Sequence, residues 1–222
     1  MLIGMEISRE DGTVYASPDT HFMHFTGKIT FTTSTNNEWG KTYIDTGVPV
    51  SAAMMPFMRQ VTLGPEGGGD GIGIGPLINY AGQWRIEVLS FFQQVINLYI
   101  FSSINPVPGD YGVAFYNEAE EIIYSSDTCP LEVYPLGDIP YKNGLLANLT
   151  FPYNVAVWPG PWGGYKAAGG VWFTVIPAAF GNTIAPMASY LDIYTKFGYA
   201  GNNAFRRNWQ GSLVYINSDL YD

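Results

Sequence analysis

Two stretches of the sequence decide the fold: Gly4-Met-Glu-Ile-Ser-Arg-Glu-Asp-Gly-Thr-Val-Tyr-Ala-Ser-Pro-Asp-Thr20 and Gly112-Val-Ala-Phe-Tyr-Asn-Glu-Ala-Glu-Glu-Ile-Ile-Tyr-Ser-Ser-Asp-Thr128. They align without a gap at a constant offset of 108 residues. The identical pairs are Gly4/Gly112, Glu10/Glu118, Ser17/Ser125, Asp19/Asp127 and Thr20/Thr128. A repeat at a fixed offset indicates that one supersecondary unit is built twice. We interpret it as a scaffold feature rather than a catalytic one.

Each copy of the repeat has the pattern of a β-hairpin. In the first copy Met5 and Ile7 alternate with polar neighbours, and residues 13–15 form the expected return strand. Asp11-Gly12 between them is the dipeptide favoured in a tight type I′ turn. The second copy has residues 117–120 at that place, without the Asp-Gly pair, so we expect a wider turn there.

Strand patterns also dominate the rest of the chain, whereas helix signals are weak. Further strands are expected at residues 28–33, 42–45, 83–89, 95–101, 145–151, 155–158, 170–176, 191–197 and 211–216. The two helix-like stretches, 52–58 and 178–191, contain Pro56 and Pro186. We therefore predict an all-β, β-sandwich-like fold with little helix. It would consist of two related β-rich halves, residues 1–106 and 107–222, each with a similar hairpin near its start and able to pack as a single body.

Composition narrows the classes of partner. Of 222 residues, 13% are charged and 16% aromatic, so much of the surface is not kept in solution by charge. Surfaces of this kind are typical of subunit interfaces. The net charge of −9 argues against nucleic acid, which requires a basic footprint. No apolar run is long enough to span a membrane, so we expect no membrane insertion. The first residues lack the pattern of a secretory signal.

Motifs for catalysis or metal binding are weak. The glycine-rich residues 64–76 lack the Gly-Lys-Ser/Thr of a phosphate-binding loop. We interpret them as a loop whose glycines allow backbone angles that other residues disfavour. His21 and His24 are the only histidines, and residues three apart on a strand point to opposite faces, so we expect no metal site. Cys129 excludes an intrachain disulfide, indicates folding in a reducing cytosol, and is expected to be buried or half-buried.

One acidic cluster deserves comparison with glycosidases, which use paired carboxylates. Glu118, Glu120 and Glu121 fall on the expected turn of the second hairpin, and Glu10 and Asp11 occupy the same place in the first copy. Acidity is therefore interpreted as a property of the hairpin tip. We expect no catalytic residues, no cofactor and no enzymatic activity.

Aromatic residues are the candidate contact residues. Trp158, Trp162 and Tyr165 lie in one turn-rich loop, and the further candidates are Trp39, Tyr199 and Trp209. Three interpretations remain open: anchors of a subunit interface, platforms for stacking sugar rings, or packing within the core.

The second copy, at residues 111–126, resembles a hairpin pattern of small virion proteins of tailed bacteriophages. That pattern has a glycine, alternating apolar residues, a polar turn, and a short apolar return that ends in an aromatic or apolar residue and serine. Gly4 to Ser17 is similar to the same hairpin. The resemblance covers two stretches of about 20 residues, and the absent Asp-Gly turn is a departure in the second copy.

The resemblance implies a non-enzymatic structural protein of the tail tip or fibre region. Such a protein would fold in the host cytoplasm and then enter the virion. Its partners would be other tail proteins and copies of itself, joined through subunit interfaces. The alternative is a receptor-binding adhesin that recognises host-surface carbohydrate through the loop containing Trp158 and Trp162.

Overall fold

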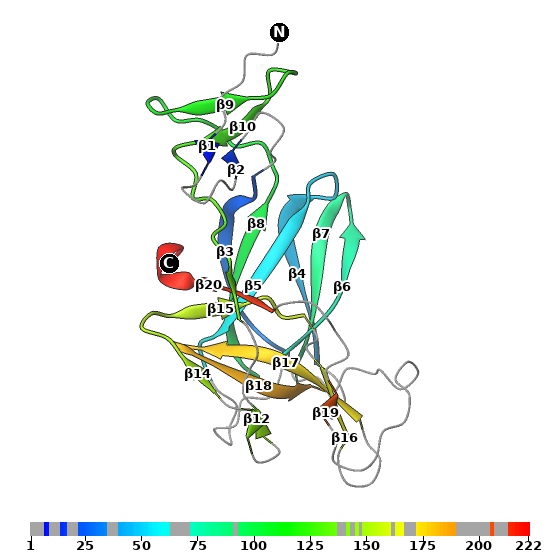
Figure 1. Ribbon diagram of the computed structural model, residues 1–222. Helices are drawn as coiled ribbons and strands as arrows, with labels where there is room; N and C mark the ends of the chain where they lie inside the picture. The colour runs from blue at the N-terminus through cyan, green and yellow to red at the C-terminus, as the bar shows by residue number, and fades with distance from the viewer. Residues whose placement is uncertain are drawn as a thin grey trace.

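The protein is described by a computed structural model covering residues 7–8, 14–16, 22–34, 40–62, 72–90, 93–136, 141–142, 145–146, 148–160, 163–166, 172–189, 205–206 and 213–222. These residues contain β-strands and one short 3₁₀ helix, η1 (Ser218–Leu220), and no α-helix. The strands form a large curled sheet, a smaller sheet packed against it, and separate hairpins (Figure 1). The prediction of an all-β, sandwich-like fold with little helix is confirmed.

The two copies of the repeat form the same hairpin in the same register. β1 (Ile7–Ser8) pairs antiparallel with β2 (Val14–Ala16), and β9 (Ala114–Tyr116) pairs antiparallel with β10 (Ile122–Ser125). Ile7 pairs with Ala16, and Phe115 pairs with Tyr124, so both partners are displaced by the repeat offset of 108 residues. Each ladder also contains a register shift. The repeat therefore specifies one supersecondary unit twice.

Local hydrogen bonds explain the sequence of the second hairpin. Its turn spans residues 117–121, where the Asn117 side-chain oxygen accepts from the N–H groups of Ala119 and Glu121 and Glu120 has φ +61°. The pairs Ser8–Val14 and Tyr116–Ile122 each enclose five residues, so the structure does not show the wider second turn expected from the missing Asp-Gly pair. Residues 9–13 of the first copy lie outside the described part. After β10, Ser125 accepts from the Asp127 N–H and from the N–H and hydroxyl of Thr128. These three residues are identities of the repeat, and they close the hairpin as a Ser/Thr turn.

The segments that follow the two hairpins pair with each other. The Leu131 N–H donates to the Met23 carbonyl at 2.8 Å, and the Phe25 N–H donates to the Cys129 carbonyl at 2.8 Å. His24 is bridged to Pro130 in the same antiparallel ladder. Both hairpins are drawn at the same end of the molecule (Figure 1).

The large sheet joins strands from both predicted halves. β3 (His24–Thr32), β8 (Val95–Ser102) and β5 (Met54–Gln60) lie in that order, and β5 then contacts β15 (Val155–Val157) and β17 (Trp172–Phe180). β15 pairs with β20 (Val214–Asn217), which pairs with β11 (Tyr134–Pro135). The remaining members are β14 (Leu149–Thr150), β16 (Gly163–Lys166), β18 (Thr183–Ser189) and β19 (Phe205–Arg206). The predicted halves thus share one sheet.

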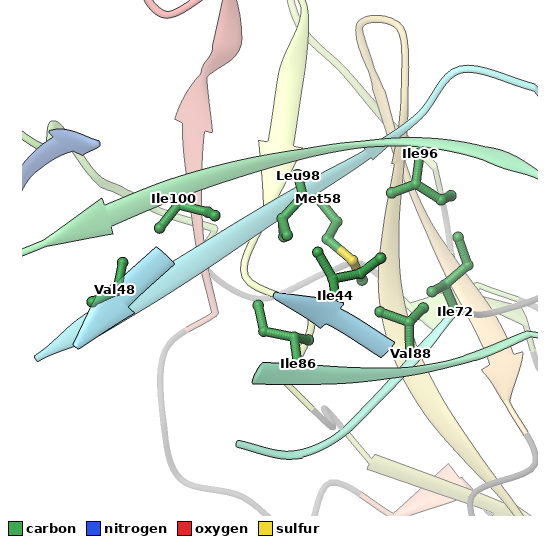
Figure 2. Close-up of a cluster of buried hydrophobic side chains, with 9 residues drawn as sticks. All are labelled: Ile44, Val48, Met58, Ile72, Ile86, Val88, Ile96, Leu98 and Ile100. Carbon is green, nitrogen blue, oxygen red and sulfur yellow. The ribbon is translucent and has the colours of Figure 1, made fainter. Parts of the chain in front are cut away.

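A second sheet completes a sandwich. It has the order β4 (Gly40–Pro49), β7 (Gln83–Ser90), β6 (Gly73–Tyr80). Figure 2 shows side chains of β4 and β7 pointing toward those of β5 and β8. The buried residues of this layer are Ile44, Val48, Met58, Ile72, Ile86, Val88, Ile96, Leu98 and Ile100. The hairpin β12 (Tyr141–Lys142) and β13 (Leu145–Leu146) stands apart from both sheets.

Two stretches of the chain differ from expectation. Residues 52–58, a broken helix by sequence, include the start of the central strand β5, and Pro56 is paired with Ile100. Pro56 is tolerated because the other neighbours of β5 begin only at Met58, so its missing N–H interrupts no second ladder. The end of the glycine-rich stretch forms a strand rather than a loop, because Gly73 to Pro76 are the first residues of the edge strand β6 (Gly73–Tyr80). Residues 63–71 and the expected strand 191–197 lie outside the described residues.

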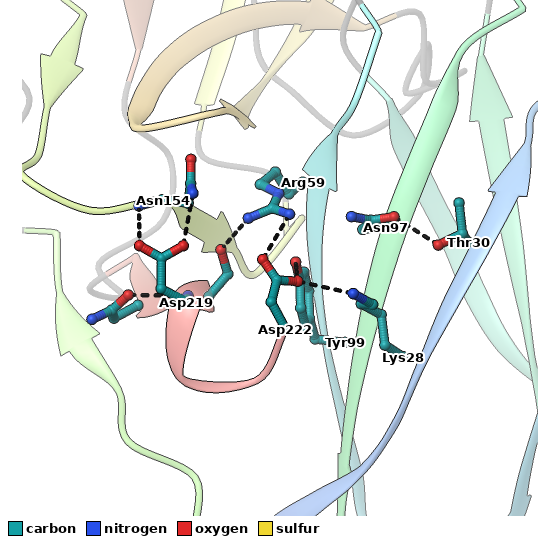
Figure 3. Close-up of polar contacts among 10 residues, drawn as sticks. Lys28, Thr30, Arg59, Asn97, Tyr99, Asn154, Asp219 and Asp222 are labelled. Atoms are coloured by element: carbon teal, nitrogen blue, oxygen red, sulfur yellow. Dashed lines mark hydrogen bonds and ion pairs between the residues drawn. The ribbon is translucent and has the colours of Figure 1, made fainter.

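The last residues dock on the outer face of β3, β8 and β5 through polar contacts (Figure 3). Asp222 accepts from Lys28 at 3.0 Å, Arg59 at 2.9 Å and Tyr99 at 2.7 Å. Burial acts to raise the pKa of Asp222, but these three donors outweigh it and hold the pKa below 3.8. Burial, followed by the hydrogen bond to Asp222, raises the pKa of Tyr99 to about 12.

Candidate interaction surface

An apolar groove with a volume of about 320 Å³ lies at one edge of the sandwich. It lies where the start of β5, the edge strand β6 and the chain after β15 come together. Its lining residues are Met54, Pro56, Ile74, Gly75, Leu77, Trp158, Pro159 and Gly160. None of them carries a charge, so the groove is suited to an apolar occupant.

Trp158 is the aromatic residue of this groove. It follows β15, and its N–H donates to the Val214 carbonyl at 3.1 Å, which ties its backbone to β20. Its six-membered ring lies against Gly160, where an added Cβ would overlap the ring. The side chain nevertheless keeps 37% of its surface exposed. One part of the ring is therefore fixed by packing while another is open for contact.

A bulge in β6 shapes the opposite wall of the groove. Gly75 and Pro76 lie between the pairs Ile74–Val88 and Leu77–Ile86, where the ladder register shifts. A Cβ at Gly75 would lie 2.8 Å from the Glu87 carboxylate oxygen, so a larger residue there would have to displace that carboxylate. Pro76 has no N–H, and a proline on an edge strand hinders further strand pairing.

Charged pairs hold the sheet next to the groove. Lys41 donates to both carboxylate oxygens of Glu87 at 3.1 and 3.2 Å, and this hydrogen bond raises the pKa of Lys41. Arg85 pairs with Asp45 and covers the Tyr80 ring, with its guanidinium carbon 3.3 Å from the ring centroid. The hydrogen bond to Arg85 lowers the pKa of Asp45. These charges are neutralised within the sheet and leave the groove wall uncharged.

The structure places only part of the predicted contact set. Trp158 lies in the groove. Tyr165 is in β16, where its backbone pairs with Phe173 and Phe205. The other candidates, Trp39, Trp162, Tyr199 and Trp209, lie outside the described residues. Their roles as interface, ligand or core residues stay predictions.

Sequence reasoning missed the other walls of the groove. The groove walls come from two strands of different sheets, with Met54 in β5 and Ile74 and Leu77 in β6. No local sequence pattern predicts that these residues lie together. Pro106 and Pro108, which lie between the two predicted halves, were a usable signal for a second surface.

A projecting apolar segment precedes the second hairpin. Pro106 is buried, and the Gly109 N–H donates to the Asp127 carboxylate at 2.7 Å, so the segment is anchored near both ends. Between them Val107 is 85% exposed, and Tyr111, just beyond, is 90% exposed. We call residues 106–111 the projecting segment. Large apolar side chains held this far out of the protein are typical of contact surfaces.

The candidate catalytic groups are not assembled into a site in the described part of the chain. Glu118, Glu120 and Glu121 are exposed on the hairpin turn. Cys129 is exposed, which corrects the expectation of a buried or half-buried thiol: its neighbour Pro130 is bridged to His24, but the sulfur itself lies outside the core. His24 is buried, and that burial lowers its pKa. His21 lies outside the described residues.

Within the described ranges, no group of three or more His, Cys, Asp or Glu side chains could hold a metal ion. The same residues include no helix with the length and apolar character needed to cross a membrane. Comparison with known proteins finds no matching family model, no matching curated protein and no matching solved structure.

Proposed function

We propose that this chain is a non-enzymatic structural protein of a tailed-bacteriophage virion, in the tail tip or fibre region, and that it acts through subunit interfaces. The observation that carries the proposal is the duplicated hairpin, whose two copies share one register. It is the same element on which the resemblance to small virion proteins rests. A duplicated, rigid β unit serves to position contact surfaces rather than reacting groups.

The exposed apolar side chains support this proposal. Four of them, Val107, Tyr111, Val113 and Tyr116, lie close together in sequence on the projecting segment and the second hairpin, and Val107 and Tyr111 are 85% and 90% exposed. A chain with few charges requires a partner to cover such a surface. In an assembly, other tail proteins or further copies of the chain would provide that cover.

The groove favours protein contact over carbohydrate. A sugar site pairs an aromatic platform with side chains that hydrogen-bond the hydroxyl groups. Apart from the indole of Trp158, the side chains lining the groove have no hydrogen-bonding group. Recognition of host-surface carbohydrate would therefore need other residues, and we do not propose it for this groove.

Composition of purified particles tests the proposal. Virus particles would be purified from cells carrying the gene in its natural genome, and tails would be separated from capsids. We expect peptides of this chain in the tail fraction, in constant ratio to other tail proteins, and antibody-gold label at the tail tip or fibres. The capsid fraction is the control. Particles that lack the chain would contradict the proposal.

A further inference from the structure

We propose that His24 makes the junction between the hairpins and the sandwich sensitive to mild acid: protonation of its imidazole opens the short ladder between residues 23–25 and 129–131, while the sandwich stays folded. We call this pairing the junction ladder. It joins the segments that follow the two hairpins, at the end of the molecule where β3 begins (Figure 1). The inference goes beyond the proposed function and would hold whether or not the chain belongs to a virion.

His24 lies at the centre of the junction ladder. Two backbone hydrogen bonds form its ends, from Leu131 to Met23 and from Phe25 to Cys129, each 2.8 Å long. Between them, His24 is bridged to Pro130 on one side and pairs with β8 on the other. A change at His24 therefore acts directly on the pairing that ties these segments to the large sheet.

The His24 imidazole is held away from water. The residue is 8% exposed, and its partner in β8, Ser102, is fully buried. Phe25 packs on the outer face of the sheet against Phe101 and Tyr221. Because successive side chains of a strand point to opposite faces, His24 is directed toward the inner face. Burial disfavours the charged imidazolium and lowers the pKa of His24 below 6.5.

The ionisable groups of the crossing segment lie at the surface. Asp127 is exposed and accepts from the Gly109 N–H at 2.7 Å. Glu132 is exposed and accepts from the Tyr134 hydroxyl at 2.6 Å. Cys129 is exposed as well. These groups are therefore not placed to neutralise a buried imidazolium.

The charges on the other elements packed around His24 are paired with one another. Those pairs are Lys28–Asp222, Arg59–Asp222, Lys41–Glu87 and Arg85–Asp45. The phenols of Tyr99 and Tyr221 donate to Asp222 and to the Pro130 carbonyl. Among the described groups, burial is the one cause that shifts the pKa of His24. A protonated His24 would therefore lack a counter-charge in the closed junction.

Local opening allows the proton to bind. Once exposed to water, His24 titrates near the ordinary pKa of 6.5, whereas in the closed junction its pKa is lower. The closed form is fully favoured above pH 6.5, and its advantage falls as the pH drops below that value, until the pH reaches the pKa of the closed form. The junction ladder opens before the sandwich because it lacks the continuous buried cluster that holds the two sheets together.

Hydrogen exchange across a pH series tests the junction. The Phe25 and Leu131 amides report on the junction ladder, and the Leu136 amide, which donates to the Leu213 carbonyl, reports on a separate pairing. Protection factors remove the intrinsic pH dependence of exchange. We expect those of Phe25 and Leu131 to fall by up to about tenfold per pH unit below 6.5, and that of Leu136 to stay constant down to about pH 5.

Two variants assign the effect to one histidine. His24→Gln keeps a polar side chain that does not titrate, and protection of the junction ladder should become independent of pH in this range. His21→Gln removes the only other histidine and is the matched control, which should keep the wild-type dependence. Circular dichroism checks that both variants fold.

Several results would overturn the proposal: constant protection of the junction ladder in the wild type, a pH dependence that survives in His24→Gln or disappears in His21→Gln, or a parallel loss at Leu136, which means global unfolding. If His24→Gln fails to fold, NMR titration of the single imidazole that remains in His21→Gln decides. A midpoint below 6.5 supports the proposal, and a midpoint at or above 6.5 contradicts it.

Discussion

Met23 and Leu131 occupy equivalent positions after the two copies of the repeat, and they pair with each other through the Leu131 N–H and the Met23 carbonyl, 2.8 Å apart. The ladder around them is antiparallel, with Phe25 bonded to Cys129. An antiparallel ladder centred on two equivalent residues has local two-fold symmetry. The segments that follow the two copies of the repeat are therefore paired symmetrically at this point.

The second hairpin should depend on the glycine that begins it. Gly112 has φ +147°, and a Cβ there would overlap the Ser126 hydroxyl oxygen, which accepts from the Val113 N–H. We expect Gly112→Ala to weaken the hairpin by about 1–3 kcal/mol, the usual cost of a backbone conformation that side chains disfavour. Hydrogen exchange of the Ser126 amide, which donates to the Val113 carbonyl, reports on it.

Gly27→Ala is the control for this variant, since an added Cβ there has no atom within 4 Å. It should leave exchange at Ser126 unchanged. Equal protection of Ser126 in Gly112→Ala and wild type would show that the hairpin does not need this glycine.

The groove should close or deform when Gly160 gains a side chain. Gly160→Ala places a methyl group where the Trp158 ring now lies, so the ring must move. We expect a shifted tryptophan emission maximum, while circular dichroism and the unfolding midpoint change little. An emission maximum that stays unchanged in Gly160→Ala would show that the Trp158 ring does not lie against this glycine.

Stability should fall in acid partly through Asp222. Its pKa in the folded protein is below 3.8, so its contribution is present above that pH and is lost as the pH falls through the folded value. Asp222→Asn should reduce the free energy of unfolding at pH 7 and flatten its decline below about pH 4. Urea titrations across this range measure both effects. An unchanged slope in Asp222→Asn would assign the acid sensitivity to other carboxyl groups.

Deprotonation of Tyr99 should lower the stability of the fold at alkaline pH. Its pKa is raised from 10.0 to about 12, so its contribution is complete below pH 10 and is lost as the pH rises through 12. The shift corresponds to roughly 2–3 kcal/mol at 1.36 kcal/mol per pH unit. Tyr99→Phe should remove one late-titrating tyrosine from the ultraviolet absorbance titration. The pKa values of Tyr134 and Tyr215 are raised as well, so the size of the late component is what is compared. A late component as large in Tyr99→Phe as in the wild type would mean that Tyr99 does not contribute to it.

The side chains of β8 that are buried between the two sheets should contribute strongly to the free energy of unfolding. Leu98 is fully buried between the sheets, so Leu98→Ala should lower the free energy of unfolding by about 2–5 kcal/mol through lost burial and a cavity. Leu220→Ala, at an exposed position, should change it by less than about 0.5 kcal/mol. Urea unfolding of both variants measures the difference. Similar values for the two would place Leu98 outside the cooperative core.

The local elements were predictable because their causes are local. The repeat at residues 4–20 and 112–128 was enough to predict two like hairpins, whereas the missing Asp-Gly pair did not lead to a longer second turn, because both hairpins enclose five residues. Alternation of apolar residues placed the strands at 83–89 and 95–101 within a residue or two of β7 and β8. Period-two patterns and turn residues act over a few positions, so the sequence displays them directly.

The all-β class, the duplicated hairpin and the low charged fraction could thus be predicted from the amino-acid order alone. The folded chain was needed to show that the Pro56 stretch is a central strand, that both halves share one sheet, and that Met54, Leu77 and Trp158 meet in one groove. These features depend on contacts between segments far apart in sequence: strand order and register arise from which apolar faces bury one another, and no local pattern carries that information.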